Sequence, residues 1–537
     1  MAKLLGRSMI GFESGGGTDD TFRAMNPGSG EPLAPDFFSA TREDVARAVE
    51  LAHHAFPAYR QTSGRDKGRL LRHIAGRIES IASPLIERAH LETALPKVRL
   101  ETETARTVNQ LRLFAGVVEE GSWVMARIDR GEPARHPLPK PDIRSMLCPL
   151  GPVAIFGASN FPLAFSVAGG DTASALAAGN PVIVKAHPAH PGTSELVGQA
   201  ITDTIRDLGL PEGVFSLLFD RGTQVGIALV EHPLVRAVGF TGSRKAGRAL
   251  LDIVAARPEP IPFFGEMSST NPVFVLPEAL RRNADTIASG LYASFTLGAG
   301  QFCTKPGIVF LPEGAEAGAF QARLRSLVEG SKGFTLLSAG IHSSYCSSVA
   351  GRRTTNAVTV VAEKPSLAQE TGFEAGAVLF ETDADSFLNH PDLGAEIFGP
   401  STLLVRHSSR DELARIARNL EGHLTATIHG TDRDLHDFQD LISVLETKVG
   451  RLIFNGFPTG VEVCHAMVHG GPYPATSDGR SSSVGSAAIL RFCRPICYQE
   501  FPNSALPPEL KDNNPLEIWR MVDGQMSKKP LSQRGRC

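Results

Sequence analysis

The region between residues 151 and 277 limits the possible folds more than any other part of the sequence, because short apolar runs alternate there with helical patterns. Each run is too short for a helix and resembles a strand that is buried on both faces. Strands alternating with helices predict an α/β fold with a doubly wound parallel sheet, which binds nucleotides at the carboxyl ends of its strands. The predicted strands cover residues 153–156, 182–185, 214–218, 237–240 and 273–276.

A local signal also marks the start of an N-terminal helix. Thr41 is followed three residues later by Asp44, which predicts a capping box, and Val45, Val49 and Ala52 follow at helical spacing. We expect Pro57 to end this helix.

Length and composition exclude several classes of protein. A chain of 537 residues is too long for one simple core, so we expect two to four domains. With 42% hydrophobic and 21% charged residues the chain is globular, and a net charge of −3 gives no reason to expect nucleic acid or a membrane surface as partner. We expect neither a secretory signal nor a membrane span, because the first residues turn polar after one short apolar run and no stretch of about 18 uninterrupted apolar residues occurs.

The seven cysteines are dispersed and odd in number, which argues against a disulfide framework and favours a reducing cytoplasm. No two Cys/His pairs recur at zinc-ligand spacing, so the sequence predicts no metal site. Cys493, Cys497 and Cys464 are interpreted as packing residues.

Three side chains could together oxidise an aldehyde covalently. Cys303 supplies a thiol that attacks the carbonyl, Asn160 an amide that stabilises the oxyanion, and Glu266 a carboxylate that activates water. An isolated cysteine is more often a buried structural residue. The flanking segments favour the catalytic interpretation.

A turn after the fourth predicted strand, residues 239–243, is a candidate phosphate site. Gly242 and Ser243 lie where a helix begins, and free backbone N–H groups there can bind a pyrophosphate. No GxGxxG fingerprint follows the first strand, and an ordinary strand–turn–helix corner would have the same sequence.

Six segments in this order resemble the aldehyde dehydrogenase superfamily, over residues 25–500. They are 159–162 (Ser-Asn-Phe-Pro), 179–185 (Gly-Asn-Pro-Val-Ile-Val-Lys), 239–243 (Gly-Phe-Thr-Gly-Ser), 264–266 (Phe-Gly-Glu), 300–303 (Gly-Gln-Phe-Cys) and 396–400 (Glu-Ile-Phe-Gly-Pro). Residues 185–195, 455–467, 469–476 and 480–485 are similar to one subgroup, the α-ketoglutaric semialdehyde (2,5-dioxovalerate) dehydrogenases and the NADP-dependent fatty aldehyde dehydrogenases. Departures from the common pattern are Ser159 before the amide and Met267-Ser-Ser-Thr270 after the carboxylate.

The resemblance implies a Rossmann-type NAD(P)-binding domain, a second αβ catalytic domain and a small oligomerisation element. We assign residues 1–129 and 151–277 to the first, 278–455 to the second, and 130–150 with a strand in 486–500 to an oligomerisation arm. Residues 501–537 are expected to form a loose C-terminal tail. A homodimer or homotetramer is implied.

The resemblance also implies roles for individual residues. Cys303 is the nucleophile, Asn160 an oxyanion donor, and Glu266 a semi-buried general base whose pKa we expect to be raised. Cofactor contacts are expected from Lys185, His187, Pro188, Arg221, Gly242, Ser243, Glu396 and Phe398.

Pro188 bears on the choice between NAD and NADP. The wider family often has a glutamate at this position, which binds the adenosine ribose and repels a 2′-phosphate. Because Pro188 removes the carboxylate and Arg221 is a candidate phosphate partner, we expect NADP to be preferred and NAD to remain usable.

The aldehyde itself is less sharply defined. A semialdehyde needs a cation at its far end, for which Arg480 is the candidate, whereas a fatty aldehyde needs an apolar funnel, for which Phe161 is one candidate. Closeness of resemblance favours 2,5-dioxopentanoate, which would be oxidised to 2-oxoglutarate. Two further functions stay open on this fold: acyl transfer to coenzyme A, and binding without catalysis. An intact Glu266 argues against the first, and the complete set of Cys303, Glu266 and Asn160 argues against the second.

Overall fold

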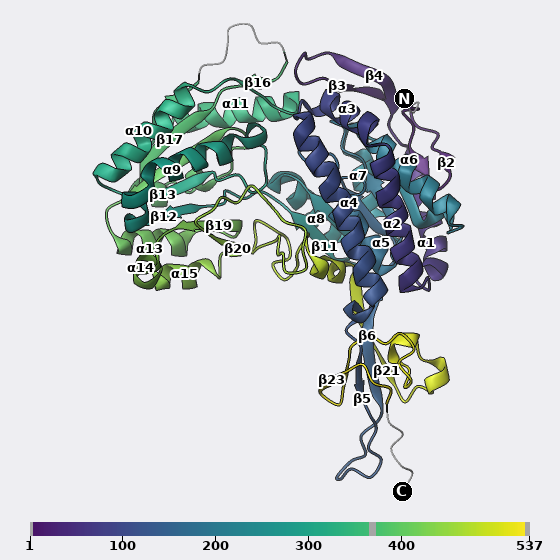
Figure 1. Ribbon diagram of the computed structural model, residues 1–537. Helices are drawn as coiled ribbons and strands as arrows, with labels where there is room; N and C mark the ends of the chain where they lie inside the picture. Colours follow the sequence, from purple (N-terminus) through teal and green to yellow (C-terminus); the bar gives the residue numbers. More distant parts are fainter. Residues whose placement is uncertain (1–3, 365–371, 532–537) are drawn as a thin grey trace.

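The computed structural model describes residues 4–364 and 372–531 and forms two lobes and a projecting arm (Figure 1). The first lobe contains a seven-stranded sheet of order β11-β10-β7-β8-β9-β1-β2, in which the first five strands are parallel. Its strands are β1 (Met9–Ile10), β2 (Glu13–Ser14), β7 (Val153–Phe156), β8 (Val182–Lys185), β9 (Phe215–Leu218), β10 (Ala237–Thr241) and β11 (Phe263–Glu266).

Helices cover both faces of this sheet because alternate strand residues point to opposite sides. Val153 and Ile155 pack in one apolar cluster, and Ala154 and Phe156 pack in another. One face is covered by α2 (Gly64–Ser80), α4 (Lys97–Glu120), α5 (Gly170–Ala178) and α6 (Pro191–Asp207), and the other by α1 (Arg42–Tyr59), α7 (Gln224–Glu231) and α8 (Arg244–Ala256). This confirms the predicted doubly wound sheet.

The second lobe has its own seven-stranded sheet, of order β15-β17-β18-β13-β12-β19-β20. Its strands are β12 (Val273–Val275), β13 (Ile308–Pro312), β15 (Thr359–Glu363), β17 (Val378–Asp383), β18 (Ser401–His407), β19 (His423–His429) and β20 (Val449–Phe454). One face packs on α9 (Pro277–Thr296) and α10 (Ala315–Glu329). The other packs on α11 (Ala339–Arg353), α12 (Ala384–Asn389), α13 (Arg410–Asn419) and α15 (Gln439–Leu445).

One strand belongs to a different sheet from the one that the sequence predicts. The pattern of alternating elements groups β12 with the nucleotide sheet, but β12 pairs with β13 and β19 in the second lobe. A fully apolar run fits the centre of either sheet, and only the pairing of the folded chain decides between them.

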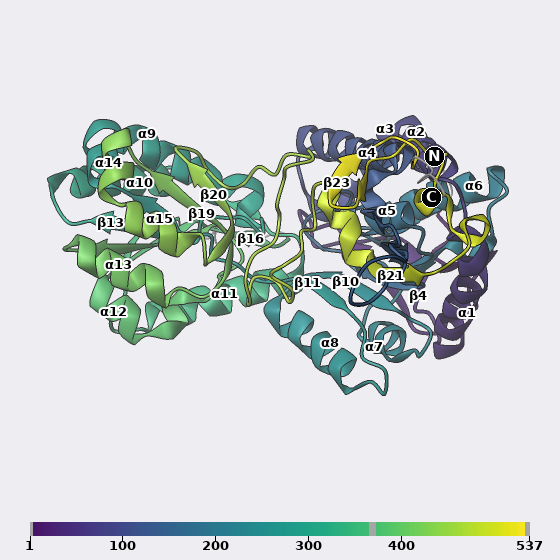
Figure 2. The ribbon, with the colours of Figure 1, turned by 90° about the horizontal axis from the view of Figure 1, so that it is seen from below.

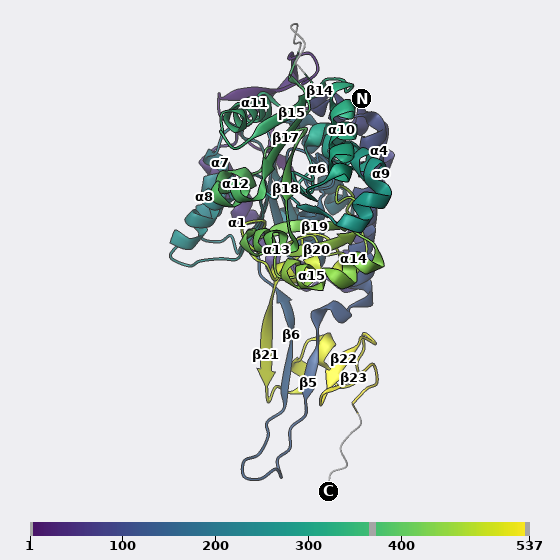
Figure 3. The same ribbon diagram turned by 90° about the vertical axis from the view of Figure 1, so that its left-hand side faces the viewer.

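The arm is a five-stranded sheet of order β21-β6-β5-β22-β23 that extends away from both lobes (Figure 3). It contains β5 (Arg127–Asp129), β6 (Ile143–Pro149), β21 (Cys493–Gln499), β22 (Arg520–Val522) and β23 (Gln525–Ser527). Residues 486–492, which the sequence places in a strand, form the 3₁₀ helix η5 (Ser486–Phe492) instead.

The segment after residue 500 differs from the expected loose tail. β22 pairs with β5, and Leu510 and Ile518 are buried against Ile128. These apolar side chains give the otherwise polar segment a small core, which holds it on the arm. Residues 532–537 lie outside the described part.

The remaining elements connect these parts. Thr41 caps α1 in the predicted capping box with Asp44, but α1 continues two residues past Pro57 to Tyr59. The short elements are β3 (Thr21–Met25), β4 (Pro32–Phe38), β14 (Phe334–Thr335), β16 (Glu374–Ala375), α3 (Ala82–Thr93), α14 (Asp432–Asp437), η1 (Ser122–Val124), η2 (Glu212–Val214), η3 (Leu297–Gly300), η4 (Pro391–Gly394), η6 (Asn503–Ala505) and η7 (Pro508–Leu510). Within the described ranges, no helix combines the length and apolar character needed to cross a membrane.

The stretch that follows β20 returns from the second lobe to the first (Figures 1 and 2). At the end of β11 it forms a bridge between Thr476 and Glu266, and the Met267 N–H donates to the Ala475 carbonyl at 2.8 Å. This contact brings a segment far along the chain to the carboxyl edge of the nucleotide sheet.

Candidate active site

Cys303 lies on the loop between η3 and β13, where the two lobes meet. Gly300 has a φ of +67°, and a Cβ there would lie 2.3 Å from the Gly399 carbonyl oxygen, so only glycine allows this close approach. The Asn271 amide donates to the carbonyl oxygens of Cys303 and Lys305 at 2.8 and 3.0 Å. The nucleophile loop is therefore held from both sides by backbone contacts.

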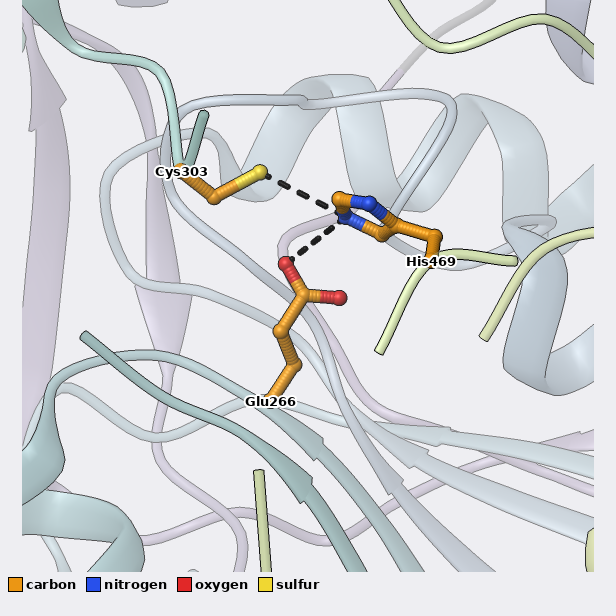
Figure 4. Close-up of side chains that lie close together, drawn as sticks. All are labelled: Glu266, Cys303 and His469. Atoms are coloured by element: carbon orange, nitrogen blue, oxygen red, sulfur yellow. Dashed lines mark hydrogen bonds and ion pairs between the residues drawn. The ribbon is translucent and has the colours of Figure 1, made fainter. Parts of the chain in front are cut away.

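Glu266, Cys303 and His469 converge on one point (Figure 4). His469 Nε2 lies 3.6 Å from the Cys303 Sγ and 3.0 Å from the Glu266 Oε1. The Ser483 hydroxyl donates to the second carboxylate oxygen at 3.0 Å. Glu266 ends β11, whereas His469 and Ser483 belong to the segment that follows β20 and bridges to β11. The Ser483 N–H donates to the His469 carbonyl at 2.8 Å, which holds these two residues together.

The electrostatics of this trio differ from the expectation for Glu266. Burial by itself would raise its pKa, but the charge and hydrogen bond of His469, with hydrogen bonds from Ser483 and Cys303, outweigh burial and lower the pKa. Burial and the neighbouring carboxylate raise the pKa of the Cys303 thiol well above its ordinary value. The thiol is therefore neutral at rest, with a proton acceptor already in contact.

Asn160 lies beside the nucleophile loop. Its side-chain amide donates to the Gln301 backbone carbonyl at 2.9 Å. The backbone carbonyl of Asn160 accepts from the Arg99 guanidinium, also at 2.9 Å. An amide nitrogen carries two hydrogens, so one remains for an oxyanion.

The expected cofactor residues of the first lobe gather at the carboxyl edge of its sheet. Lys185 ends β8, and its ammonium donates to the Asp220 carbonyl at 3.0 Å. Burial lowers the pKa of Lys185 to about 8. Ser243 caps α8 by accepting from the Ala246 N–H, and the Gly242 N–H donates to the Glu266 carbonyl at 3.1 Å.

The other residues expected to contact the cofactor surround this edge. His187 and Pro188 follow Lys185 and are half-buried, and burial lowers the pKa of His187 well below its ordinary value. Arg221, at the end of the next strand, has a side chain that is 62% exposed and lies 3.8 Å from Asp20. Its guanidinium is therefore accessible to a ligand.

Glu396 and Phe398 belong to the segment between η4 and β18, which contacts the nucleophile loop. The buried Lys305 ammonium donates to the carbonyls of Ile397 and Ser401 at 2.8 and 2.9 Å, which ties this segment to the loop. Burial raises the pKa of Glu396 to about 7, although Lys305 opposes this effect.

A cavity of about 760 Å³ opens in front of Cys303. Phe161 lies in its wall and packs edge-on against Phe165 and Phe302, with ring centroids 5.3 and 5.2 Å apart. Arg480 does not reach this cavity: its side chain is 91% exposed and pairs with Asp478. The turn that aims Ser483 at Glu266 directs Arg480 outward, so the structure places the predicted substrate residue away from this cavity.

Three arginines that the sequence does not single out line the cavity. Arg99 and Arg106 come from α4, and Arg451 comes from β20. The sequence does contain a signal for two of them: Arg99, Glu103 and Arg106 are spaced so that they share one face of a helix. The sequence offers no signal for the role of His469, because nothing in it pairs this histidine with Cys303, which lies 166 residues away.

Comparisons with known proteins agree with this geometry. Residues 15–488 match the profile of the aldehyde dehydrogenase family. The chain is 50% identical to "Alpha-ketoglutaric semialdehyde dehydrogenase 2" of Azospirillum brasilense, with 97% of this chain and 99% of the relative covered. It is 43% identical to "Alpha-ketoglutaric semialdehyde dehydrogenase" of Acinetobacter baylyi, with 98% and 100% covered.

Solved structures share the fold at lower identity. PnpE in complex with nicotinamide adenine dinucleotide has a TM-score of 0.77 at 22% identity, with 92% of this chain and 97% of that chain covered. 3,6-Anhydro-L-galactose dehydrogenase in complex with NAP has a TM-score of 0.79 at 21% identity, with 92% and 99% covered. The profile match and the two relatives together place this chain in the aldehyde dehydrogenase family.

Proposed function

We propose that this protein oxidises 2,5-dioxopentanoate to 2-oxoglutarate, with NADP preferred and NAD usable. The observation that carries this proposal is the arginine cluster of the cavity: Arg99, Arg106 and Arg451. The names of the two curated relatives point to the same substrate.

The cluster has unused hydrogen-bond donors. Arg99 Nη1, Arg106 Nε and Nη2, and Arg451 Nε are buried without a hydrogen-bond partner among the described residues. Burial lowers the pKa of all three guanidinium groups, which shows that the protein leaves these cations short of solvation. A buried cation without a full set of partners is costly, and an anionic ligand removes that cost.

The charge balance of the cavity wall fits one carboxylate. Glu103 and Glu462 are its two acids and oppose the three arginines, which leaves one positive charge. One oxygen of Glu103 is already occupied, because it accepts from the Leu163 and Ala164 N–H groups at 2.9 and 3.0 Å. A 2-oxo acid offers a carboxylate and a keto oxygen, which match guanidinium donors.

A fatty aldehyde fits the same cavity less well. Phe161, Phe165 and Phe302 can pack against a short carbon chain. A long alkyl chain, however, would cover the arginine donors without bonding to them. Leaving a hydrogen bond to a charged group unmade costs about 1.5–3 kcal/mol, so the arginines select against it.

The chemistry follows from the convergent trio. The Cys303 sulfur attacks the aldehyde carbon while its proton passes to the His469–Glu266 pair, which releases it to solvent through the cavity before hydrolysis. The Asn160 amide and the Cys303 N–H donate to the resulting oxyanion. The nicotinamide, when bound, supplies the hydride acceptor that leaves a thioester on Cys303. The Glu266 carboxylate, kept ionised by its lowered pKa, then takes a proton from water, which releases the acid.

The residues of the first lobe fit a phosphorylated dinucleotide. The buried Lys185 ammonium has one backbone acceptor, and the cap of α8 presents N–H groups at the same edge. Pro188 offers no carboxylate that would repel a 2′-phosphate, and the exposed Arg221 lies at the end of the neighbouring strand. A kcat/KM for NAD more than tenfold above that for NADP would contradict the preference.

The substrate is tested by measuring reduced-cofactor absorbance with 2,5-dioxopentanoate, glutarate semialdehyde and hexanal. We expect kcat/KM to fall in that order. Glutarate semialdehyde lacks the keto oxygen that the arginines could bind, and hexanal lacks the carboxylate as well. Hexanal equal to or better than 2,5-dioxopentanoate would favour a fatty aldehyde as the substrate. A rate that requires coenzyme A would indicate acyl transfer.

We also propose that the chain assembles as a homodimer or homotetramer in the cytoplasm. β21 is an edge strand of the arm, and Leu490 and Phe501, which flank it in sequence, expose apolar surface. Met521 and Met526 expose apolar surface on β22 and β23, at the opposite edge. Sedimentation of the purified chain measures the assembly, and a monomer at micromolar concentration would contradict it.

A further inference from the structure

We propose that Cys303, His469 and Glu266 form an inhibitory binding site for a thiophilic divalent cation such as Zn²⁺. The three donor atoms, a sulfur, an imidazole nitrogen and a carboxylate oxygen, lie within 4.8 Å of one another. The thiol and the carboxylate both face the same nitrogen, Nε2 of His469 (Figure 4). The site therefore already has the convergence that a chelate requires.

The distances suit tetrahedral zinc. Bonds of about 2.3 Å to sulfur and about 2.1 Å to nitrogen at the tetrahedral angle separate those two ligand atoms by about 3.6 Å. The observed separation between Sγ and Nε2 is 3.6 Å. The nitrogen and the carboxylate oxygen are 3.0 Å apart, and zinc needs about 3.3 Å. The sulfur and the carboxylate oxygen lie within 4.8 Å, and zinc needs about 3.6 Å, so rotation of the Glu266 or Cys303 side chain completes the geometry.

The surroundings fix both the orientation and the access. Ser483 donates to the Glu266 oxygen that does not face His469, which leaves the other oxygen for the metal. Cys303 borders the cavity, so a water molecule can take the fourth coordination position. His469 and Glu266 are 1% and 5% exposed, which shields the metal from competing water.

Charge decides which cations bind. A thiolate and a carboxylate neutralise a dication. The binding step exchanges the Cys303 S–H bond for a sulfur–metal bond, replaces any hydrogen on His469 Nε2 by the metal, and releases these protons to solvent. Soft sulfur and borderline imidazole select Zn²⁺, Cd²⁺ or Co²⁺ over Mg²⁺ and Ca²⁺. The nearby Arg106 cation opposes the metal, so binding is reversible rather than structural.

Occupancy of this site stops the reaction at its first step. The metal holds the sulfur lone pair that attacks the aldehyde and the carboxylate that activates water. We therefore expect Zn²⁺ to inhibit competitively with aldehyde, and a chelator to restore activity.

The test titrates the full-length enzyme, free of cofactor, with Co²⁺ and follows the thiolate-to-cobalt charge-transfer absorption. One equivalent of Co²⁺ should bind per chain with release of protons, Zn²⁺ should displace it, and Mg²⁺ should not. Cys303→Ser should remove the band. Cys497→Ser, which changes an exposed cysteine on the arm, is the matched control and should retain it.

Two further variants distinguish a chelate from a lone thiol. His469→Gln and Glu266→Gln should each weaken Co²⁺ binding at least about tenfold, since even changes outside the ligand set cost this much. Thermal unfolding and NADPH binding show whether each variant is folded. A band that survives Cys303→Ser, or unchanged affinity in a folded His469→Gln or Glu266→Gln variant, would overturn the proposal. The readout needs no aldehyde, so it is independent of the proposed substrate.

Discussion

The two regions that flank Cys303 differ in how their buried charged groups are hydrogen-bonded. On one side, Glu266 is buried but has partners on both oxygens, His469 and Ser483. On the other side, Arg99, Arg106 and Arg451 keep buried nitrogens without partners among the described residues. A preorganised base needs its hydrogen bonds before substrate arrives, whereas a recognition site keeps donors free for the ligand to fill.

The largest effect should come from removing the atom that both sides share. Cys303→Ala should lower kcat by about 10⁴-fold or more, because Cys303 is the only thiol among the described residues that line the cavity. NADPH binding, measured by fluorescence, should change little. Substantial aldehyde oxidation by this variant would contradict the role of Cys303 and remove the basis of the comparison.

On the base side, Glu266→Gln should slow thioester hydrolysis by about 10²- to 10⁴-fold. The amide retains the shape and a hydrogen bond but cannot take a proton from water. One equivalent of reduced cofactor should form in a burst, with the acyl group detectable on Cys303 by mass spectrometry. Normal steady-state turnover would show that another group activates water.

On the recognition side, Arg106→Met should lower kcat/KM for 2,5-dioxopentanoate by about 10- to 100-fold, which corresponds to one or two lost charge-assisted hydrogen bonds. Oxidation of hexanal should be unchanged or faster, since the apolar chain gains a methionine contact. Arg480→Met is the matched control, because that side chain faces solvent. Equal losses for both aldehydes would show that Arg106 is structural instead.

The smallest effect concerns the cofactor edge. Lys185 loses its proton as pH rises through its pKa of about 8, so NADP affinity should fall about fivefold from pH 8 to pH 9. Equilibrium binding followed by fluorescence measures this decline. Lys185→Arg should flatten it, because guanidinium does not titrate there. A flat profile for the unchanged enzyme would contradict the proposed contact.

Local signals predict much of the fold. The capping box of Thr41 and Asp44 begins α1 as expected, because a cap depends on residues three positions apart. Pro57 does not end the helix, because in the last turn a proline removes only one backbone hydrogen bond. The sequence places β12 in the wrong sheet, because an apolar run records burial but not its neighbours.

Some residues of the candidate site can be predicted from sequence motifs, and others are revealed only by the structure. Cys303, Glu266 and Asn160 can be proposed from the sequence because each lies in a short, ordered motif, and the structure brings them to one place. Arg480 is a cation near such a motif, but the structure directs it to solvent. The arginines of the cavity come from α4 and β20, two elements that no sequence spacing relates.

By itself the sequence determined the doubly wound sheet and the family resemblance, and it proposed a nucleophile and a base, because these depend on hydrophobic period and on chemistry carried by adjacent residues. Only the tertiary structure decided which residues surround the nucleophile. It brought His469 to Glu266 across 203 positions and left three arginines facing one cavity. Contacts of this kind depend on how strands and helices pack, and packing is a property of the whole folded chain.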